Sequence, residues 1–429
     1  MPSRPRHTGN RVRSVHVKTL GCKVNQAESA GVVAALTASG ARFAVAREAE
    51  IVIVNTCSVT AEADRKARKA IRRALGSPAH PTVLVTGCLA ALDPDGVAAL
   101  GERVVVEPDR ERVFAVASAV AGLVEVTTPP DARSANGPRT RVAVKVQDGC
   151  DACCAYCVVP FARGEPRSVD LRAVVHEVEA LAASGVAEVV VTGINLGRYR
   201  SAGAALPGLV RAVASTGVKR VRLSSVEPLG VTRDLADTFA ETPQLCPHLH
   251  VPLQSGSDDV LEAMRRGYSA AEYLERLALL RDAVPGIAVT TDVMVGFPGE
   301  TESDFARTLS VIEQAEFARL HVFRYSSRAG TRAADLDGQV DATVASRRAA
   351  VVREYDARLR RAYARKRRGQ EADVLVERVG ADTTWASGTT EDYLKTRFAA
   401  ATGMKQGDVV RVLLGDVQGD DVHATALHQ

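Results

Sequence analysis

Three closely spaced cysteines constrain this chain more than any other feature of its sequence. Cys150, Cys154 and Cys157 follow the spacing Cys-x3-Cys-x2-Cys, and an aromatic residue, Tyr156, precedes the last thiol. Three thiolates at this spacing can bind three irons of a four-iron, four-sulfur cluster and leave the fourth iron open to another ligand. A tetrahedral zinc site normally has a fourth Cys or His close by, whereas the first Cys or His that follows Cys157 is His176. The alternative is a chance group of free thiols, which are usually solitary and buried.

A second set of three cysteines follows predicted strands in the N-terminal part of the chain. Residues 14–126 alternate between predicted strands and helices, with strands at 15–18, 50–55 and 82–86 and helices at 27–37 and 61–75. Cys22, Cys57 and Cys88 follow these strands at intervals of 35 and 31 residues, each suited to one strand–helix–strand unit. Parallel strands end at one edge, where α/β folds bind ligands, so we expect a second three-cysteine site with one free iron. Alternatively, the three are unrelated small apolar residues.

From residue 141 onward the pattern predicts six strand–helix repeats. The strands are expected at 141–146, 188–192, 220–223, 248–253, 288–295 and 320–323, and the helices near 171–184, 206–215, 232–241, 270–284 and 302–316. Eight such units close a barrel, so six predict a partial (β/α)6 barrel. The loop that carries Cys150 follows the first strand, at the edge where such barrels bind their ligands.

Small and polar residues follow several of these strands at the same edge. They are Thr192, Gly193, Asn195, Ser224, Glu227, Gln254, Gly296, Pro298 and Gly299. Each of them taken singly is typical of a turn. Together, around the mouth of one pocket, they are suited to binding a polar cofactor.

The last part of the chain predicts a basic helix followed by a small barrel. Residues 351–368 form the helix, and short strands at 374–377, 393–398 and 409–414 indicate a small antiparallel β-barrel that contains the only tryptophan, Trp385. Barrels of this size often bind oligonucleotides through exposed aromatic and cationic side chains. The alternative is a barrel that serves folding or dimerisation.

Composition and charge distribution bear on the compartment and the partners. The chain has 429 residues, no apolar run approaches the length of a membrane span, and no secretory signal is recognised, so we expect a cytoplasmic protein without a membrane partner. Its eight cysteines then indicate metal or redox chemistry. The net charge is only +4, but basic residues crowd 353–368 and recur along 65–73. Such runs are commonly solvated surface, although two of them favour a nucleic-acid partner.

A turn-rich, apolar-poor stretch separates the two cysteine-containing regions. We therefore expect an N-terminal parallel-sheet cluster domain at 12–126, a linker at 127–140, the partial barrel with its trailing helix at 141–368, and the small barrel at 369–429.

These features together closely resemble the methylthiotransferases of the radical S-adenosylmethionine superfamily. The resemblance covers nearly the whole chain, and the final barrel resembles a TRAM domain. Within the family, three stretches are similar to the branch that modifies N6-threonylcarbamoyladenosine in transfer RNA: Thr19-Leu20-Gly21-Cys22-Lys23-Val24-Asn25-Gln26, the run from Asn55 to Lys66, and His248-Leu249-His250-Val251-Pro252-Leu253-Gln254-Ser255-Gly256-Ser257. Cys153 departs from the family pattern and is expected not to be a ligand, and the role of Cys246 is open.

The resemblance implies two [4Fe-4S] clusters and S-adenosyl-L-methionine as cofactors. The cluster at Cys150, Cys154 and Cys157 would bind and cleave S-adenosylmethionine, and Tyr156 and the glycines after the fifth strand would lie against that cofactor. The cluster at Cys22, Cys57 and Cys88 would deliver sulfur to carbon 2 of an adenine flipped out of a tRNA anticodon loop. A flavodoxin- or ferredoxin-like electron donor and a sulfur source would also be required.

Three alternative functions remain open at this point. The first two use the same chemistry, on N6-isopentenyladenosine in tRNA or on an aspartate of a ribosomal protein. The third is a non-catalytic iron–sulfur protein that senses redox state and binds RNA. Cleavage of S-adenosylmethionine by the reduced protein would exclude this last function.

Overall fold

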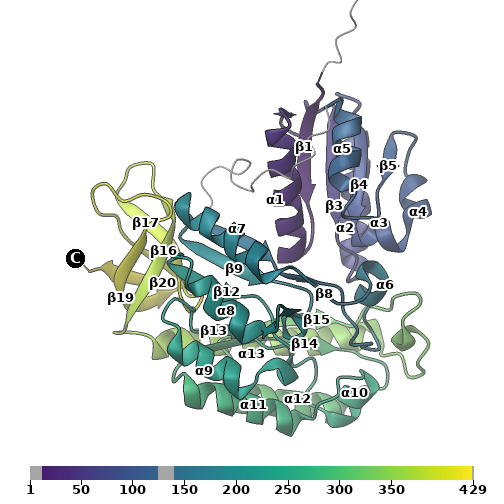
Figure 1. Ribbon diagram of the computed structural model, residues 1–429. Coiled ribbons are helices and arrows are strands. Elements are labelled where there is room, and N and C mark those ends of the chain that lie inside the picture. Colours follow the sequence, from purple (N-terminus) through teal and green to yellow (C-terminus); the bar gives the residue numbers. More distant parts are fainter. Residues whose placement is uncertain (1–11, 124–139, 428–429) are drawn as a thin grey trace, which may run out of the picture. The chain divides into compact units, whose positions relative to one another are not determined.

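The computed structural model describes residues 12–123 and 140–427, which form two compact units (Figure 1). The first unit contains residues 12–123 together with Phe161–Arg163, and the second contains the rest. The predicted linker, 127–140, lies outside the described residues except for Thr140. Among the helices that these residues form, none combines the length and apolar character needed to span a membrane.

The first unit is built on a five-stranded sheet with the order β2-β1-β3-β4-β5, and all four pairings are parallel. The strands are β1 (Ser14–Thr19), β2 (Arg42–Phe43), β3 (Ile51–Thr56), β4 (Thr82–Gly87) and β5 (Val104–Val106). The order reverses between β1 and β3, and doubly wound folds bind their ligands at such a point.

Helices cover both faces of this sheet because its central strands β3 and β4 carry uninterrupted apolar runs, at 51–54 and 83–85. Ile51 and Ile53 pack with α1 (Lys23–Ala38) and α5 (Val113–Ala121) on one face. Val52 and Val54 pack on the other face with α2 (Ala61–Leu75), α3 (Cys88–Leu92) and α4 (Pro94–Ala98). The predicted parallel sheet is therefore confirmed, although β2, β5, α3, α4 and α5 were not predicted.

The second unit contains the six parallel strands that the sequence predicts. They are β6 (Arg141–Lys145), β9 (Glu188–Thr192), β12 (Arg220–Leu223), β13 (His248–His250), β14 (Ala288–Val295) and β15 (Arg319–Arg324). Three strands pair on each side, and parallel bridges from Val221 to Leu245 and from Ser225 to His250 join the two halves. The helices between the strands are α7 (Leu171–Ala183), α8 (Leu206–Ala214), α9 (Arg233–Glu241), α11 (Ala270–Ala283) and α12 (Glu302–Ala315).

Several short elements that the periodicity did not predict complete this core. They are β7 (Gln147–Asp148), α6 (Val159–Arg163), β8 (Arg167–Ser168), η1 (Leu196–Arg198), β10 (Arg200–Ser201), β11 (Ala204–Ala205), η2 (Pro228–Gly230), α10 (Asp258–Ala263) and η3 (Arg332–Ala334). Segments of two to six residues are too short for a pattern of period 2 or 3.6 to identify them.

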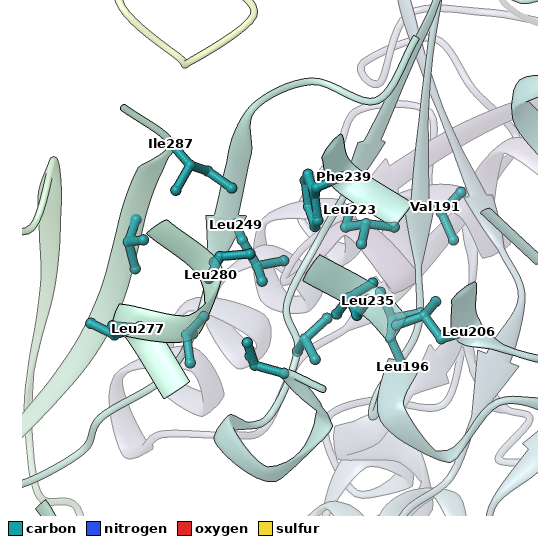
Figure 2. Close-up of a cluster of buried hydrophobic side chains, with 14 of the residues drawn as sticks. Val191, Leu196, Leu206, Leu223, Leu235, Phe239, Leu249, Leu277, Leu280 and Ile287 are labelled. Carbon is teal, nitrogen blue, oxygen red and sulfur yellow. The ribbon is translucent and has the colours of Figure 1, made fainter. Parts of the chain in front are cut away.

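The main hydrophobic core lies between the strands of the partial barrel and their helices (Figure 2). Val191, Leu223 and Leu249 from the strands meet Leu206, Leu235, Phe239, Leu277 and Leu280 from the helices. On β14, Val289, Val293 and Val295 belong to this core, so Thr290, Asp292 and Met294, which alternate with that face, lie on the opposite side of the sheet. That opposite side carries polar groups.

The C-terminal region consists of a long helix and a closed five-stranded barrel. Helix α13 (Ala342–Lys366) begins nine residues before the predicted start, because the side chain of Asp341 caps it by accepting from the backbone N–H of Thr343. The strands are β16 (Glu371–Val379), β17 (Trp385–Thr390), β18 (Lys395–Ala399), β19 (Val409–Gln418) and β20 (Asp421–Ala426), in the order β16-β17-β18-β20-β19. All pairings are antiparallel except that of β18 with β20. The predicted fold class is confirmed.

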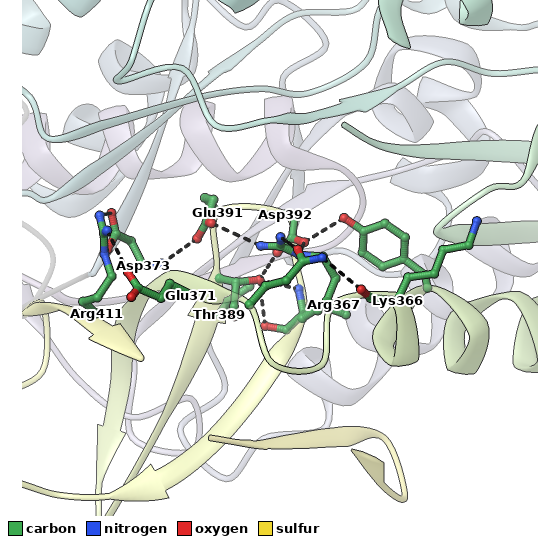
Figure 3. Close-up of polar contacts among 12 residues, drawn as sticks. Lys366, Arg367, Glu371, Asp373, Thr389, Glu391, Asp392 and Arg411 are labelled. Atoms are coloured by element: carbon green, nitrogen blue, oxygen red, sulfur yellow. Dashed lines mark hydrogen bonds and ion pairs between the residues drawn. The ribbon is translucent and has the colours of Figure 1, made fainter. Parts of the chain in front are cut away.

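Charged side chains connect this barrel to helix α13 (Figure 3). Arg367, which follows the helix, donates to Asp392 at 2.7 Å and lies 3.5 Å from Glu391. The Tyr363 hydroxyl donates to the same Asp392 carboxylate at 2.7 Å. The turn between β17 and β18 is therefore held against the end of the helix.

The same turn between β17 and β18 also contacts charged residues of the partial barrel. Glu188 accepts from Arg222 at 3.0 Å and lies 2.9 Å from Arg220, and Arg222 also donates to the backbone carbonyls of Glu391, at 2.6 Å, and Thr390, at 3.1 Å. Burial alone would raise the pKa of Glu188, but Arg222, Arg220 and a third guanidinium lower it to about 2. A buried carboxylate thus stays charged because cations surround it.

Candidate functional site: two groups of three cysteines

The first three-cysteine loop follows β7 and places its thiols near one another. The backbone N–H of Cys157 donates to the carbonyl of Cys154 at 3.0 Å, which makes a tight turn between these two residues. Burial raises the pKa of the Cys157 thiol to about 12, and the neighbouring thiols of Cys154 and Cys150 add to the effect. Cys153, which is predicted not to be a ligand, is exposed and has a positive φ of 46°.

Side chains from the adjacent strand hold this loop in place. Gln147 donates to the carbonyls of Asp148, at 2.7 Å, and Gly149, at 2.8 Å, and its oxygen accepts from the backbone N–H of Asn195 at 2.7 Å. The Asn195 amide lies 3.9 Å from the sulfur of Cys150. Asn195, which the sequence predicts as a cofactor contact, therefore lies beside the first thiol.

A buried arginine that the sequence analysis did not identify lies against the second thiol. Arg266 donates to the sulfur of Cys154 at 3.2 Å and to the Tyr156 hydroxyl at 3.5 Å, and it forms a close ion pair with Glu227. Burial raises the pKa of Cys154, and the positive charge of Arg266 opposes that rise. Arg266 is separated from Cys154 by 112 residues, so spacing gives no signal for it.

The other predicted contacts all lie in the second unit, at or just beyond the carboxyl ends of its strands. Ser224 follows β12, and its buried hydroxyl has no hydrogen-bond partner within the described part of the chain. Gln254 has a positive φ of 66°, and its backbone bonds to Asp292 and Met294 of β14. Thr192 and Gly193 end β9 at the same edge.

The stretch after β14 has packing roles of its own. At Gly296, with φ +77°, an added Cβ would lie 2.6 Å from the Cβ of Ala345 in α13, so only glycine fits there. Pro298 is buried, whereas Gly299 is exposed and donates its N–H to Gly338. Their proposed contact with a cofactor stays a prediction.

The second group of cysteines lies at the carboxyl edge of the sheet in the first unit. Cys22 precedes α1, Cys57 follows β3 and Cys88 begins α3, so two of them flank the point where the strand order reverses. Burial raises the pKa of the Cys57 thiol to about 11, and the thiols of Cys88 and Cys22 contribute further. The fold therefore brings together three residues that are far apart in sequence.

Glycines allow these cysteines to approach one another. Gly21 has φ +108°, and an added Cβ would lie 2.7 Å from the Cβ of Cys57. Gly87 has φ +91°, and an added Cβ would lie 2.3 Å from the carbonyl oxygen of Thr56. Both the backbone angle and the space exclude larger residues.

A buried polar network supports this edge. The Asn25 amide donates to the carbonyls of Leu20, at 3.0 Å, and Thr56, at 2.9 Å, and to the side chain of Asn55 at 3.1 Å. It thereby joins the loops after β1 and β3. Arg110 points a guanidinium nitrogen at the sulfur of Cys88, 3.7 Å away. Neither role follows from the sequence, because hydrogen-bond partners depend on the tertiary fold.

In neither cysteine group do all three sulfurs lie as close together as the ligands of a single ion would. A single tetrahedral zinc would hold thiolates roughly 3.8 Å apart. Within residues 12–123 and 140–427, the one group of three His, Cys, Asp or Glu ligand atoms that all lie within 4.8 Å of one another contains no cysteine. A four-iron cluster places each thiolate on a different iron and so needs a wider spacing.

Comparison with protein families gives two matches. Residues 144–312 match the Radical SAM superfamily, and residues 14–106 match a group described as uncharacterized protein family UPF0004. The first match contains the loop with Cys150, Cys154 and Cys157, and the second contains Cys22, Cys57 and Cys88.

Several related proteins align with almost the whole chain. The threonylcarbamoyladenosine tRNA methylthiotransferase MtaB of Thermotoga maritima is 35% identical over 90% of this chain and 92% of its own length. The protein of the same name from Bacillus subtilis is 34% identical over 93% of each. A tRNA-2-methylthio-N(6)-dimethylallyladenosine synthase from Mycolicibacterium paratuberculosis is 35% identical over 94% of this chain and 84% of its own.

A solved structure supports the fold. The radical S-adenosylmethionine methyltransferase TsrM from Kitasatospora setae superimposes with a TM-score of 0.53 at 17% identity, covering 72% of this chain and 73% of that one. The chain therefore belongs to the methylthiotransferase family of radical S-adenosylmethionine enzymes.

Proposed function

We propose that this protein attaches a methylthio group to carbon 2 of N6-threonylcarbamoyladenosine next to the anticodon of tRNA. The observation that carries the proposal is the presence of two separate three-cysteine sites in one chain, each at the carboxyl edge of parallel strands. The cluster at Cys150, Cys154 and Cys157 would bind S-adenosylmethionine, and the cluster at Cys22, Cys57 and Cys88 would deliver sulfur. The relatives named MtaB support the threonylcarbamoyl substrate.

The chain's residues fit the two clusters as follows. Cys150, Cys154 and Cys157 would hold the cluster that, when bound, supplies the electron for cleaving S-adenosylmethionine, and Cys22, Cys57 and Cys88 would hold the second. Ligation requires thiolates, and the metal replaces the protons that burial otherwise favours. Asn195 and Arg266 orient the first loop through contacts with its sulfurs.

The cofactor contacts are proposed from the same edge. Tyr156, Thr192, Gly193, Ser224, Glu227, Gln254, Gly296, Pro298 and Gly299 would surround S-adenosylmethionine. The buried Ser224 hydroxyl would gain a hydrogen-bond partner when a polar ligand binds. A flavodoxin- or ferredoxin-like protein would supply electrons, a further source would resupply sulfur, and the enzyme would work in the cytoplasm.

RNA would be held by the C-terminal barrel and by part of the basic helix. Several cations of α13 are already paired, such as Arg358 with Glu313 and Lys366 with Glu316. Arg353, Arg361 and Arg365 are exposed, and no acidic side chain within the described residues pairs with them. On the barrel, Arg397 stacks 4.5 Å from the Trp385 ring, a surface on which a base can stack.

The decisive experiment is mass spectrometry of tRNA nucleosides from cells that lack the gene. We expect 2-methylthio-N6-threonylcarbamoyladenosine to disappear and its precursor without the methylthio group to accumulate. If the isopentenyl nucleoside lost its methylthio group instead, the result would support the function named for the dimethylallyladenosine synthases. Those relatives are about as similar to this chain as the proteins named MtaB are. No change in either would leave the ribosomal-protein substrate or the non-catalytic protein.

Iron counting tests the second cluster independently of the substrate. After anaerobic reconstitution, the wild-type protein should bind close to twice the iron of the Cys22→Ala/Cys57→Ala/Cys88→Ala variant, because that variant keeps only the first site. A Cys153→Ala variant is the matched control and should retain full iron. Equal iron in the wild type and the triple variant would mean that the second cluster does not exist.

A further inference from the structure

Three metal-ligating side chains lie together on neighbouring strands, apart from both cysteine groups. His250 ends β13, Asp292 lies in the middle of β14 and His321 lies on β15. One ligand atom from each lies within 4.8 Å of the other two. Across the described ranges this is the single group of His, Cys, Asp and Glu with that property.

Strand register explains why the three side chains meet. His250 pairs with Thr290 across β13 and β14, and His321 pairs with Asp292 across β14 and β15. Thr290 and Asp292 are two residues apart, so they share a face of the sheet. That face is opposite to the one where Val289 and Val293 enter the hydrophobic core. The three ligands therefore point to the polar side of the partial barrel.

The nitrogen atoms surround one carboxylate oxygen. Nε2 of His250 lies 3.2 Å from Oδ1 of Asp292, and Nδ1 of His321 lies 3.4 Å from the same oxygen. Ligands on one metal ion at about 2.1 Å are separated by roughly 3 Å, which matches these distances. The two imidazoles stack with their ring centroids 5.2 Å apart, so both are already oriented toward the carboxylate.

An outer hydrogen bond fixes the ring of His250. Its second nitrogen, Nδ1, lies 2.9 Å from the hydroxyl oxygen of Thr290. When Nδ1–H donates to this oxygen, the lone pair of Nε2 faces Asp292. Histidines that bind metals are held in this way, with the other ring nitrogen bonded to a fixed acceptor.

The site is accessible from solvent and close to the first cysteine loop. The side chains of His321, Asp292 and His250 are 46%, 26% and 13% exposed, so a metal ion can reach these ligands from solvent. Met294, two residues after Asp292 on the same face, packs against the small apolar cluster that contains Ala155 of the first cysteine loop. Two residues along a strand correspond to about 7 Å.

We propose that His250, Asp292 and His321 bind a divalent transition-metal ion such as Zn²⁺. Two imidazoles and one carboxylate are the ligand types that zinc and ferrous iron accept in proteins, and three protein ligands leave a position open for water or another oxygen donor. The site is independent of the six cluster cysteines and of the proposed substrate. Without a metal, the same groups would only form hydrogen bonds to one another.

The test uses the cluster-loaded enzyme, in which the cysteines are already occupied. Anaerobic equilibrium dialysis against micromolar Zn²⁺, with zinc and iron counted together by mass spectrometry, should show one more zinc per chain in the wild type than in His321→Ala. Asp292→Asn should lose the same zinc, because the amide cannot supply the negative charge. Iron content should be the same in all of these proteins.

A matched control and the iron count make the outcome decisive. His423→Ala removes an exposed histidine of β20 and should leave zinc binding unchanged. The iron count reports whether each variant is folded and loaded, and His321 and Asp292 provide two independent variants. Equal zinc in the wild type, His321→Ala and Asp292→Asn would overturn the proposal and leave a hydrogen-bonded group without a metal.

Discussion

The sulfur of Cys154 illustrates how single residues adjust this site. Arg266 is the residue that places a buried positive charge 3.2 Å from this sulfur, and the same guanidinium contacts Glu227 and Tyr156. Hydrogen bonds and charge at the cysteine sulfurs are among the factors that set the potential of an iron–sulfur cluster. We therefore regard Arg266 as a positioning residue that also favours cluster reduction.

Replacing Arg266 with Gln tests this role. The variant should keep its iron, but its first cluster should have a more negative reduction potential, and cleavage of S-adenosylmethionine should fall roughly 10–100-fold. Potentiometric titration monitored by electron paramagnetic resonance measures the change. Arg265→Gln, at the neighbouring residue, which has no hydrogen bond to the thiols, is the control. An unchanged potential in Arg266→Gln would contradict the assignment.

Residue patterns identified the thiols and Asn195 beside Cys150, but not the other polar neighbours of the thiols. The spacing of Cys150, Cys154 and Cys157 could be recognised because all three ligands lie on one loop. Arg266, Gln147 and Asn25 contribute through the fold, and nothing in their local sequence distinguishes them from structural polar residues. The predicted cofactor contacts, including Ser224 and Gly299, share an edge with the loop and remain predictions.

At the scale of elements, strand ends decide where the second cysteine group lies. The loops after β1, β3 and β4 meet at one edge because every strand of the sheet is parallel. Gly87 allows the last of these loops to turn directly from β4 into α3. The approach is so close that the hydrogen on its α-carbon points at the carbonyl of Thr56.

Gly87→Ala should therefore disturb the second cysteine group selectively. An added Cβ would lie 2.3 Å from the Thr56 oxygen, and φ of +91° is unfavourable for alanine, so Cys88 should move away from Cys22 and Cys57. Reconstituted protein should then lose up to half of its iron. Gly31→Ala, in α1 where an added Cβ meets nothing within 4 Å, is the matched control. Full iron in Gly87→Ala would show that the loop can adapt.

The long apolar elements were predictable and the short ones were not. Strand 288–295 and helix 61–75 match the predicted bounds, because continuous apolar or amphipathic runs of this length are distinctive. In the C-terminal barrel, β17 and β20 were missed because Gly388 and the polar residues of β20 interrupt the alternation. Their strand conformation comes from pairing with neighbours.

At the scale of the second unit, a buried charge network joins the C-terminal barrel to the partial barrel. Glu188 is surrounded by arginines, and Arg222 and Arg220 also donate to backbone carbonyls of Glu391, Thr390 and Asp373 in the barrel. The ring of Tyr393 lies 3.8 Å from the guanidinium carbon of Arg222. No sequence pattern predicts this joint, since its members are separated by more than 150 residues.

The low pKa of Glu188 predicts a dependence of stability on pH. Because the folded pKa of about 2 is below the ordinary value of 4.5, the network stabilises the fold above pH 4.5, and this contribution is lost as the pH falls from 4.5 toward 2. Glu188→Gln should lower stability by about 3–5 kcal/mol at neutral pH and reduce that acid dependence. Thermal unfolding at pH 7 and below 4.5 measures both effects. Glu179→Gln, exposed on α7, should behave as wild type.

Removing the C-terminal barrel should also damage the core. A chain that ends at residue 368 leaves Arg222 and Arg220 without their carbonyl partners, and unpaired buried donors are costly. We expect a lower unfolding temperature and poor cluster loading, in addition to weaker RNA binding. A truncated protein with wild-type stability and iron content would show that water replaces these carbonyls without loss.

This joint has a consequence for any attempt to exchange parts between relatives. The guanidinium group of Arg222 is planar and donates to two particular carbonyls, so the barrel can dock in only one orientation. A purely hydrophobic interface would allow the two parts to shift relative to each other. A barrel taken from a relative and joined after α13 would therefore need a turn with the same conformation as Thr390–Tyr393. Otherwise it would need other groups that accept hydrogen bonds from Arg222. Because the barrel docks in one orientation, the RNA-binding role proposed for it cannot be transferred by exchanging the barrel alone.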